Sequence, residues 1–253
     1  MDTVDRLTAG EMAETCEFSD DAAEEIRAAI RQPRPLLNRL QWHCLQPRRL
    51  IFRALYGLLY CLNRILLRLF FRVHIHGADN LPRSDRFVLA ANHSSPLDAP
   101  LLAGALPLTV LENTYWAGKE STVLKNALRR GLSFVTRVMP ISSGVPALAA
   151  GAAVLQSANL VWFPEGRRSR SGELLPFRPG IAWLLQEHQV TLVPVRIDGA
   201  QVAYRDRSAW PRLWTRIDVR IGKPLSRTDL GIGAADSTVE TVLAHIRAAV
   251  LSA

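Results

Sequence analysis

A histidine and an aspartate five residues apart, His93 and Asp98, are the residues of this sequence best suited to proton transfer. The apolar run 87–91 before them is typical of a buried strand, and Pro96 suits the first turn of a helix. His93 is therefore expected at a strand-to-helix junction, where a neutral imidazole can take a proton from a hydroxyl group. Asp98, about one turn further on, can select the imidazole tautomer and stabilise the cation that forms. The alternative is a capping histidine beside a first-turn aspartate, with no chemistry.

A second group of polar residues follows another predicted strand, at residues 160–163. The turn after that strand contains Gly166 and three arginines within four residues, Arg167, Arg168 and Arg170. Guanidinium groups match the geometry of phosphate oxygens, and glycine lets a ligand approach the backbone closely. An exposed basic turn without a ligand is the alternative. Because both groups follow a buried strand, we expect them to lie at one edge of a sheet.

Four sequence blocks occur in the order that one enzyme family shows. They are Asn-His-Ser-Ser-Pro-Leu-Asp at 92–98, Gly-Leu-Ser-Phe-Val-Thr-Arg at 131–137, Phe-Pro-Glu-Gly-Arg-Arg-Ser at 163–169, and Val-Thr-Leu-Val-Pro-Val at 190–195. With Phe-Arg-Pro-Gly at 177–180, they make residues 73–225 resemble the lysophosphatidate acyltransferases, the glycerolipid acyltransferases with an His-x4-Asp motif. One departure is Arg167, where the family usually has threonine. The third block is also similar to acyltransferase domains fused to acyl-activating enzymes, which need not use lysophosphatidate.

The alternation of predicted strands and helices, together with the resemblance, predicts an α/β fold. We expect a single domain with a mixed β-sheet flanked by helices, glycerolipid-acyltransferase-like, and a basic amphipathic helix near the N-terminus. The sequence divides into an acidic leader (1–30), a basic amphipathic membrane-association segment (31–73) and an acyltransferase domain (74–253).

The resemblance implies an O-acyltransferase of phospholipid biosynthesis. It would move a fatty acyl group from an acyl thioester, acyl-CoA or acyl-carrier protein, to the hydroxyl of a lysophospholipid, with 1-acylglycerol-3-phosphate as the first choice. His93 and Asp98 would be catalytic, and Arg168 would bind the acceptor phosphate. The other residues expected at the substrate are Lys119, Arg137, Glu165, Gly166 and Arg167. In these roles Glu165 braces the arginine loop, Gly166 offers backbone N–H groups to the oxyanion, and Arg167 is an extra charge.

Other functions remain open on the sequence alone. One is an acyltransferase for another lysolipid or amphiphilic acceptor, another is a thioesterase or lipase, and a third is a non-catalytic lipid-binding protein. The pairing of His93 with Asp98 argues against the last, which has no need of a general base. No cofactor is implied beyond the acyl donor. No metal is implied either, because His74 and His76 have no third ligand placed by the sequence.

The charge of the 253-residue chain is unevenly distributed. The net charge is +8, but residues 1–30 carry nine acids against two arginines, whereas residues 31–73 carry nine arginines and no acid. No zinc-finger, basic-zipper or aromatic RNA-binding pattern accompanies the arginines, so nucleic acid is not an expected partner. An anionic membrane surface suits them better. The three cysteines form no Cys-x-x-Cys pair, which favours a reducing compartment.

Residues 50–72 have the periodicity of an amphipathic helix. Arginines 49, 53, 64, 68 and 72 fall on one side, and leucine, isoleucine and phenylalanine on the other. The longest uncharged run, 54–63, has ten residues, whereas spanning a bilayer takes about 20. We therefore expect peripheral binding at the cytoplasmic face of the membrane, with the helix in the headgroup plane. The alternative is a helix packed on the domain's own core.

Overall fold

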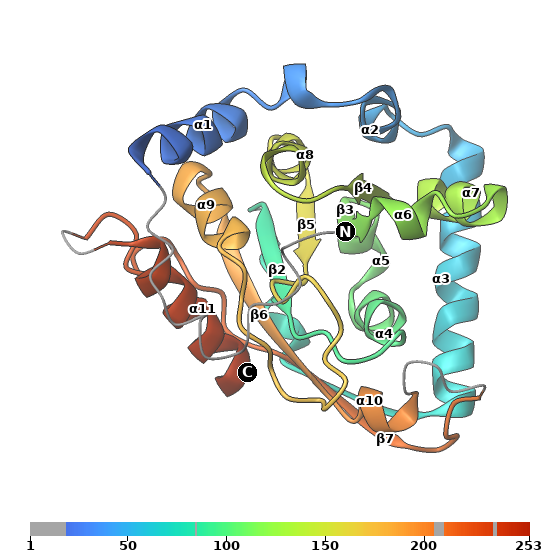
Figure 1. Ribbon diagram of the computed structural model, residues 1–253. Coiled ribbons are helices and arrows are strands. Elements are labelled where there is room, and N and C mark those ends of the chain that lie inside the picture. Colours follow the sequence, from blue (N-terminus) through green and yellow to red (C-terminus); the bar gives the residue numbers. More distant parts are fainter. Residues whose placement is uncertain (1–18, 84, 205–209, 235–236) are drawn as a thin grey trace, which may run out of the picture.

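The computed structural model describes residues 19–253 except 84, 205–209 and 235–236. These residues form one sheet with strand order β1-β7-β6-β2-β5-β3-β4 (Figure 1). The strands are β1 (Arg72–His76), β2 (Phe87–Ala91), β3 (Thr114–Lys119), β4 (Val138–Ile141), β5 (Asn159–Trp162), β6 (Thr191–Asp198) and β7 (Arg216–Ile221). Neighbours are parallel except β6 and β7, which are antiparallel, so the prediction of a mixed sheet is confirmed.

Helices connect the strands and cover the sheet. They are α1 (Asp20–Arg31), α2 (Arg39–Leu45), α3 (Leu50–Phe70), α4 (Asp98–Ala105), α5 (Leu108–Leu111), α6 (Glu120–Val123), α7 (Ala127–Val135), α8 (Val145–Leu155), α9 (Gly180–Glu187), α10 (Ala200–Ala203) and α11 (Val239–Ser252). Short 3-10 turns occur at Arg34–Leu36 and Ala78–Asn80.

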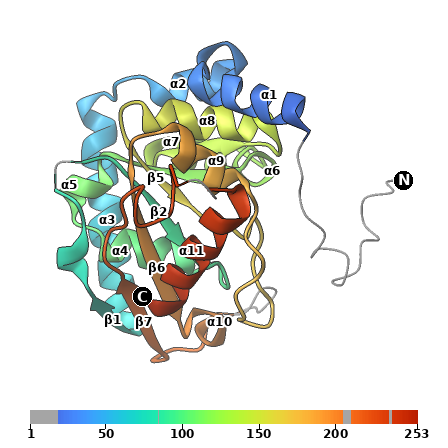
Figure 2. The same cartoon turned by 90° about the vertical axis from the view of Figure 1, so that its left-hand side faces the viewer.

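Each face of the sheet has its own apolar core (Figures 1 and 2). Side chains of β2 alternate between them: Val88 and Ala90 join the core with α1, α8, α9 and α11, whereas Phe87 and Leu89 join the core with α3 and α4. Every residue of β2 is buried, as is usual for a parallel strand covered on both faces. The segment that leaves β2 therefore starts from the centre of the molecule.

The C-terminal part of the predicted acidic leader (1–30) is a helix, α1, that packs on the domain. Residues 1–18 lie outside the described residues, but α1 packs on α8 and α9. Ala23, Ile26 and Ile30 are buried there, at the spacing of one helix face, and the acidic side chains lie on the other faces. Residues 20–31 thus belong to the domain's core.

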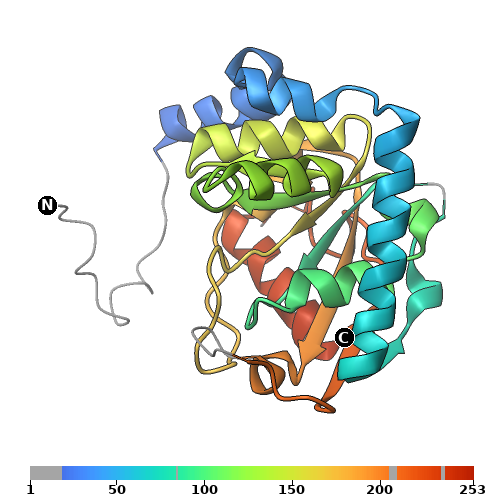
Figure 3. The ribbon, with the colours of Figure 1, turned by 90° about the vertical axis from the view of Figure 1, so that its right-hand side faces the viewer.

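Helix α3 has two apolar faces. One contains the buried Tyr56 and Leu67, with Phe52, Leu59 and Phe70 half-buried beside them, and packs against α4 and the sheet. The other face is open to solvent (Figure 3). Its most exposed large side chains, with their exposed fractions, are Leu50 (78%), Ile51 (70%), Leu58 (65%) and Ile65 (60%). The helix is therefore both packed on the domain and apolar outward. By length and composition it is the one described helix that could cross a membrane.

A helix and a strand follow each other closely in the segment 123–141. Helix α7 runs to Val135, and β4 begins at Val138. The Asn126 side chain accepts a hydrogen bond from the Arg129 N–H and starts the helix there. The block 131–137 therefore lies on the end of a helix and not on a strand.

Candidate active site

The end of β2 is fastened to the neighbouring strand β6 by Asn92. Its side-chain amide is buried, donates to the Ile197 carbonyl at 2.9 Å and accepts from the Ile197 N–H at 2.7 Å. These two bonds continue the β2–β6 pairing by one residue, after which the chain turns away from the sheet. His93 therefore leaves the sheet at a defined position.

His93 and Asp98 form a hydrogen-bonded pair, with 2.7 Å between Nδ1 and Oδ2. Asp98 is the first residue of α4, and its side chain has no exposed surface. The same oxygen accepts the backbone N–H groups of Ser94 at 2.6 Å and Ser95 at 2.8 Å. Since Asp98 accepts the proton on Nδ1, Nε2 of His93 is left as an acceptor. The ring of His93 stacks on Phe163, with centroids 4.2 Å apart.

Glu165 joins the arginine loop to the histidine. Its buried carboxylate accepts the His93 N–H at 2.6 Å through one oxygen and the Leu175 N–H at 2.9 Å through the other. A second bond runs from the Ser169 N–H to the His93 carbonyl, at 2.7 Å. Burial raises the pKa of Glu165, while the two backbone N–H groups oppose that rise. Glu165 therefore braces both loops from behind.

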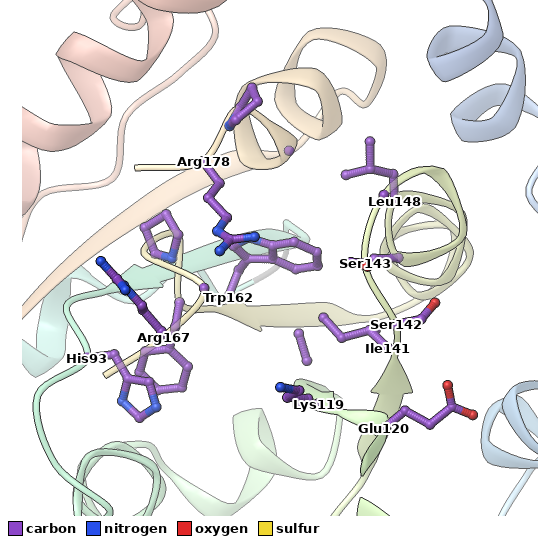
Figure 4. A pocket seen from close by; sticks show the side chains of 18 of the residues that line it. His93, Lys119, Glu120, Ile141, Ser142, Ser143, Leu148, Trp162, Arg167 and Arg178 are labelled. Carbon is purple, nitrogen blue, oxygen red and sulfur yellow. The ribbon is translucent and has the colours of Figure 1, made fainter. Parts of the chain in front are cut away.

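A cavity of about 1490 Å³ opens at the C-terminal ends of β2, β3, β4 and β5. His93, Lys119, Arg167 and Arg178 line it (Figure 4), and so do Gly166, Arg168 and Arg170. Another part of its wall is apolar, formed by Ala117, Ile141, Val145, Leu148 and Trp162, and a third part carries Glu120 and the hydroxyl side chains of Ser121, Thr122, Ser142 and Ser143. This combination suits a ligand with an anionic head and a long apolar part.

Most of the predicted site residues meet at this cavity. His93, Lys119, Gly166, Arg167 and Arg168 line it, whereas Asp98 and Glu165 lie behind the wall and hold His93 in place. The two groups of polar residues thus share one sheet edge, because β2 and β5 are parallel neighbours and both groups follow their C-terminal ends.

Arg137 is the exception, because the structure does not bring it to this cavity. It lies at the N-terminal end of β4, whereas the cavity lies at the C-terminal end, and it does not line that cavity. Its guanidinium lies 4.7 Å from the centroid of the Tyr115 ring. Helix α7 ends at Val135 and β4 begins at Val138, so Arg137 lies in the turn between them.

Arg178 lines the cavity, although the sequence assigned it no role. Its N–H donates to the Pro164 carbonyl at 2.8 Å, and its side chain crosses Gly166. A Cβ atom at Gly166 would lie 2.7 Å from the Arg178 Nε, and Gly166 has a positive φ of 68°. The positive φ favours glycine at 166, and the Arg178 side chain occupies the space that a Cβ atom would take. The charged residue in the block 177–180 was the signal that pointed to this site.

No cluster of three or more metal-ligating side chains occurs among the described residues. The described part of the site offers hydrogen-bond donors and a base.

The family model named Acyltransferase matches residues 72–198, which is half of the chain. The chain belongs to this family. The 1-acyl-sn-glycerol-3-phosphate acyltransferase alpha of Mus musculus is 28% identical over 165 residues, which cover 63% of this chain and 56% of the mouse protein. The Homo sapiens enzyme of the same name is 30% identical over 139 residues, 53% of this chain and 48% of its own length. The chain thus spans about half the length of these relatives.

One solved structure is similar over nearly the whole fold. The crystal structure of the 1-acyl-sn-glycerophosphate (LPA) acyltransferase PlsC from Thermotoga maritima superposes with a TM-score of 0.64. The superposition covers 91% of this chain and 92% of that chain, at 17% sequence identity. The acyltransferase fold predicted from the sequence is confirmed.

We predict that Glu165→Gln lowers the free energy of unfolding by about 1–3 kcal/mol, because the amide NH2 cannot accept one of the two backbone N–H groups. Urea unfolding measures the loss. Glu173→Gln, on the same loop but exposed, is the matched control and should change little.

The same pair of variants carries a pH signature. Because burial raises the pKa of Glu165 above 4.5, the carboxyl group of Glu165 binds a proton more tightly in the folded protein than in the unfolded chain. The contribution of Glu165 to the free energy of unfolding is therefore largest below pH 4.5 and falls as pH rises toward the pKa in the folded protein. The stability deficit of Glu165→Gln should shrink over that window. A deficit that grows with pH contradicts the raised pKa.

Proposed function

We propose that this protein is an O-acyltransferase that moves a fatty acyl group from an acyl thioester to the hydroxyl of a lysophospholipid, 1-acylglycerol-3-phosphate in the first place. The observation that carries the proposal is the His93–Asp98 pair at the arginine-lined end of a cavity that also has an apolar wall. Membership in the acyltransferase family supports the reaction class, and the names of the relatives support the acceptor.

The proposed reaction begins with His93. Its Nε2 takes the proton from the acceptor hydroxyl, and Asp98 stabilises the imidazolium through the Nδ1–H bond. The oxygen attacks the thioester carbonyl, and a tetrahedral oxyanion forms. When the oxyanion collapses, the C–S bond breaks, the ester forms, and the thiolate takes the proton from His93. No acyl-enzyme is needed, and no cofactor takes part beyond the acyl donor, acyl-CoA or acyl-carrier protein.

The arginine loop provides for the acceptor phosphate. Arg168 stands where the family's phosphate arginine is expected, Arg167 adds a second guanidinium, and Lys119 contributes a point charge from the end of β3. Because the loop is tied to the backbone of His93, a phosphate held by these residues is at a set distance from the base. The apolar part of the cavity wall is then in contact with an acyl chain.

Helix α3 supports membrane association. Its outward face is apolar, and Arg53, Arg64 and Arg68 lie along its border at 100° per residue. Lysophospholipids partition into bilayers, so peripheral docking of this face at an anionic, cytoplasmic membrane surface would bring the cavity to its substrate.

We predict that His93→Ala and Asp98→Asn each lower kcat by about 10²–10⁴-fold. Formation of acylated lipid and of free fatty acid from a labelled thioester is followed with lysophosphatidate present. Circular dichroism and thermal melting check that each variant is folded. Acylation near the wild-type rate by a folded His93→Ala variant excludes this mechanism. Release of fatty acid without acylated lipid favours a thioesterase.

We predict that Arg168→Ala raises the apparent KM for the acceptor about 10–100-fold and leaves the thioester KM nearly unchanged, because a charge-assisted hydrogen bond is lost. Arg168→Lys should recover part of the loss, since lysine lacks the fork. Arg130→Ala, an exposed arginine of α7, is the control. A rise in the thioester KM alone would assign the loop to the acyl carrier. A panel of lysolipids tests whether Arg167 shifts the preferred head group.

We predict that changing Arg64, Arg68 and Arg72 together to Gln weakens binding to anionic vesicles by about 1 kcal/mol per arginine. Wild-type binding should weaken with salt without vanishing, because the apolar face contributes a salt-insensitive part. Vesicle flotation measures both. Equal binding to neutral and anionic vesicles, unchanged by the substitutions, contradicts electrostatic docking of α3.

A further inference from the structure

Two tryptophans are exposed on the segment that leads into β7. Trp210 has 84% of its surface exposed and Trp214 has 59%, with Leu213 exposed between them at 54%. Large aromatic side chains are rarely left in water, and two in one short segment form an apolar patch that marks a contact site. The described structure covers neither indole with another element of the chain.

Backbone hydrogen bonds fasten this segment to the C-terminal end of α3. The Trp214 N–H donates to the Phe70 carbonyl at 2.6 Å, and the Arg72 N–H donates to the Thr215 carbonyl at 3.0 Å. Trp214 also has a positive φ of 59°, which is uncommon for a bulky residue and costs free energy. The exposed indole is thus held in place beside α3, where Figure 1 shows the orange segment ahead of β7 next to the lower end of the helix.

The other end of the segment begins beside the catalytic loop. The Ser95 hydroxyl donates to the Tyr204 carbonyl at 2.7 Å, just after α10. Further along, the Arg212 N–H donates to the Ala203 carbonyl at 2.6 Å, which ties the tryptophan-bearing part back to α10. Residues 212–214 are therefore bonded to α10, next to the contact of Tyr204 with Ser95, and to the C-terminal end of α3.

Positive charge surrounds the tryptophans. Arg68, Arg72, Arg212 and Arg216 are all exposed, and Arg216 alone of the four has an ion pair among the described residues, with Asp218 at 2.9 Å. Indole rings prefer the headgroup level of a bilayer, where one side is apolar and the other is wet. Arginines beside them favour anionic headgroups.

We propose that Trp210 and Trp214 form a second membrane anchor that inserts at the headgroup level of an anionic phospholipid bilayer, in line with the apolar face of α3. This inference rests on the membrane association proposed above. A protein docked on a membrane through one helix can rotate as a whole about the axis of that helix. A second contact beside the catalytic loop stops that rotation and holds the entrance of the active site toward the lipid.

The test is flotation of the full chain with vesicles of phosphatidylcholine, with and without phosphatidylglycerol. Trp210→Ala with Trp214→Ala should lower the affinity for anionic vesicles roughly ten-fold or more. Trp210→Ala alone, at a side chain that is 84% exposed, should give part of that loss and guards against a folding defect at Trp214. Leu251→Ala, an exposed apolar residue on α11, is the matched control and should bind like wild type.

Quenching by lipids brominated near the headgroup gives a second readout. Wild-type tryptophan fluorescence should be quenched on binding, and the double variant should lose most of that quenching. The proposal is overturned if flotation and quenching are unchanged in the double variant. It is also overturned if the wild type binds neither kind of vesicle. Loss of self-association in the double variant, with vesicle binding intact, would show that a second copy covers the patch and also overturns it.

Acylation of an acceptor dissolved in detergent separates this inference from the proposed function. The double variant should match wild type there and fall behind when the acceptor is presented in vesicles. If wild type acylates no acceptor in detergent, the proposed function fails, while flotation and quenching still decide the anchor.

Discussion

The site depends on one buried carboxylate oxygen. Oδ2 of Asp98 accepts hydrogen bonds from Nδ1–H of His93 and from the backbone N–H groups of Ser94 and Ser95. The Asp98 side chain has no exposed surface. Three donors on one oxygen hold the turn between β2 and α4 in a single conformation, and they orient the imidazole at the same time. The turn and the base are therefore one structure: the hydrogen bonds that let the chain leave the sheet also leave Nε2 of His93 as the acceptor.

Glu165 repeats this arrangement across the site. It is buried behind the arginine loop, and its two oxygens bind the backbone at His93 and at Leu175. As a result, His93 and the arginine loop are connected through main-chain atoms. Their relative position is set by the parallel pairing of β2 with β5 and by Glu165.

The apolar outer surface is also held in place by contacts with the rest of the domain. The inner face of α3 packs on the core through Tyr56 and Leu67, so the helix cannot turn its outer leucines inward. The tryptophan-bearing segment is hydrogen bonded to Phe70 at the end of that helix and to Ala203 of α10, and Ser95 is hydrogen bonded to Tyr204 just after α10. The apolar surface and the loop that carries His93 are thus joined through hydrogen bonds. If the apolar surface docks on a bilayer, these connections also set the orientation of the cavity relative to that bilayer.

The sequence by itself determined the local features: the strand ending before His93, the pairing with Asp98, the arginine turn and the helical pattern of 50–72. These depend on spacing within one element or between neighbouring ones, whereas the acyltransferase fold was predicted with the help of a resemblance to a family. The sequence did not locate Arg137, which lies in the turn between α7 and β4 and away from the cavity. Tertiary structure alone decided that Glu165 reaches the backbone of His93, 72 residues earlier in the chain, that Arg178 lines the cavity, and that Trp214 meets the end of α3. Such contacts join residues far apart in the chain, and their partners follow from strand order and register, which no local pattern encodes.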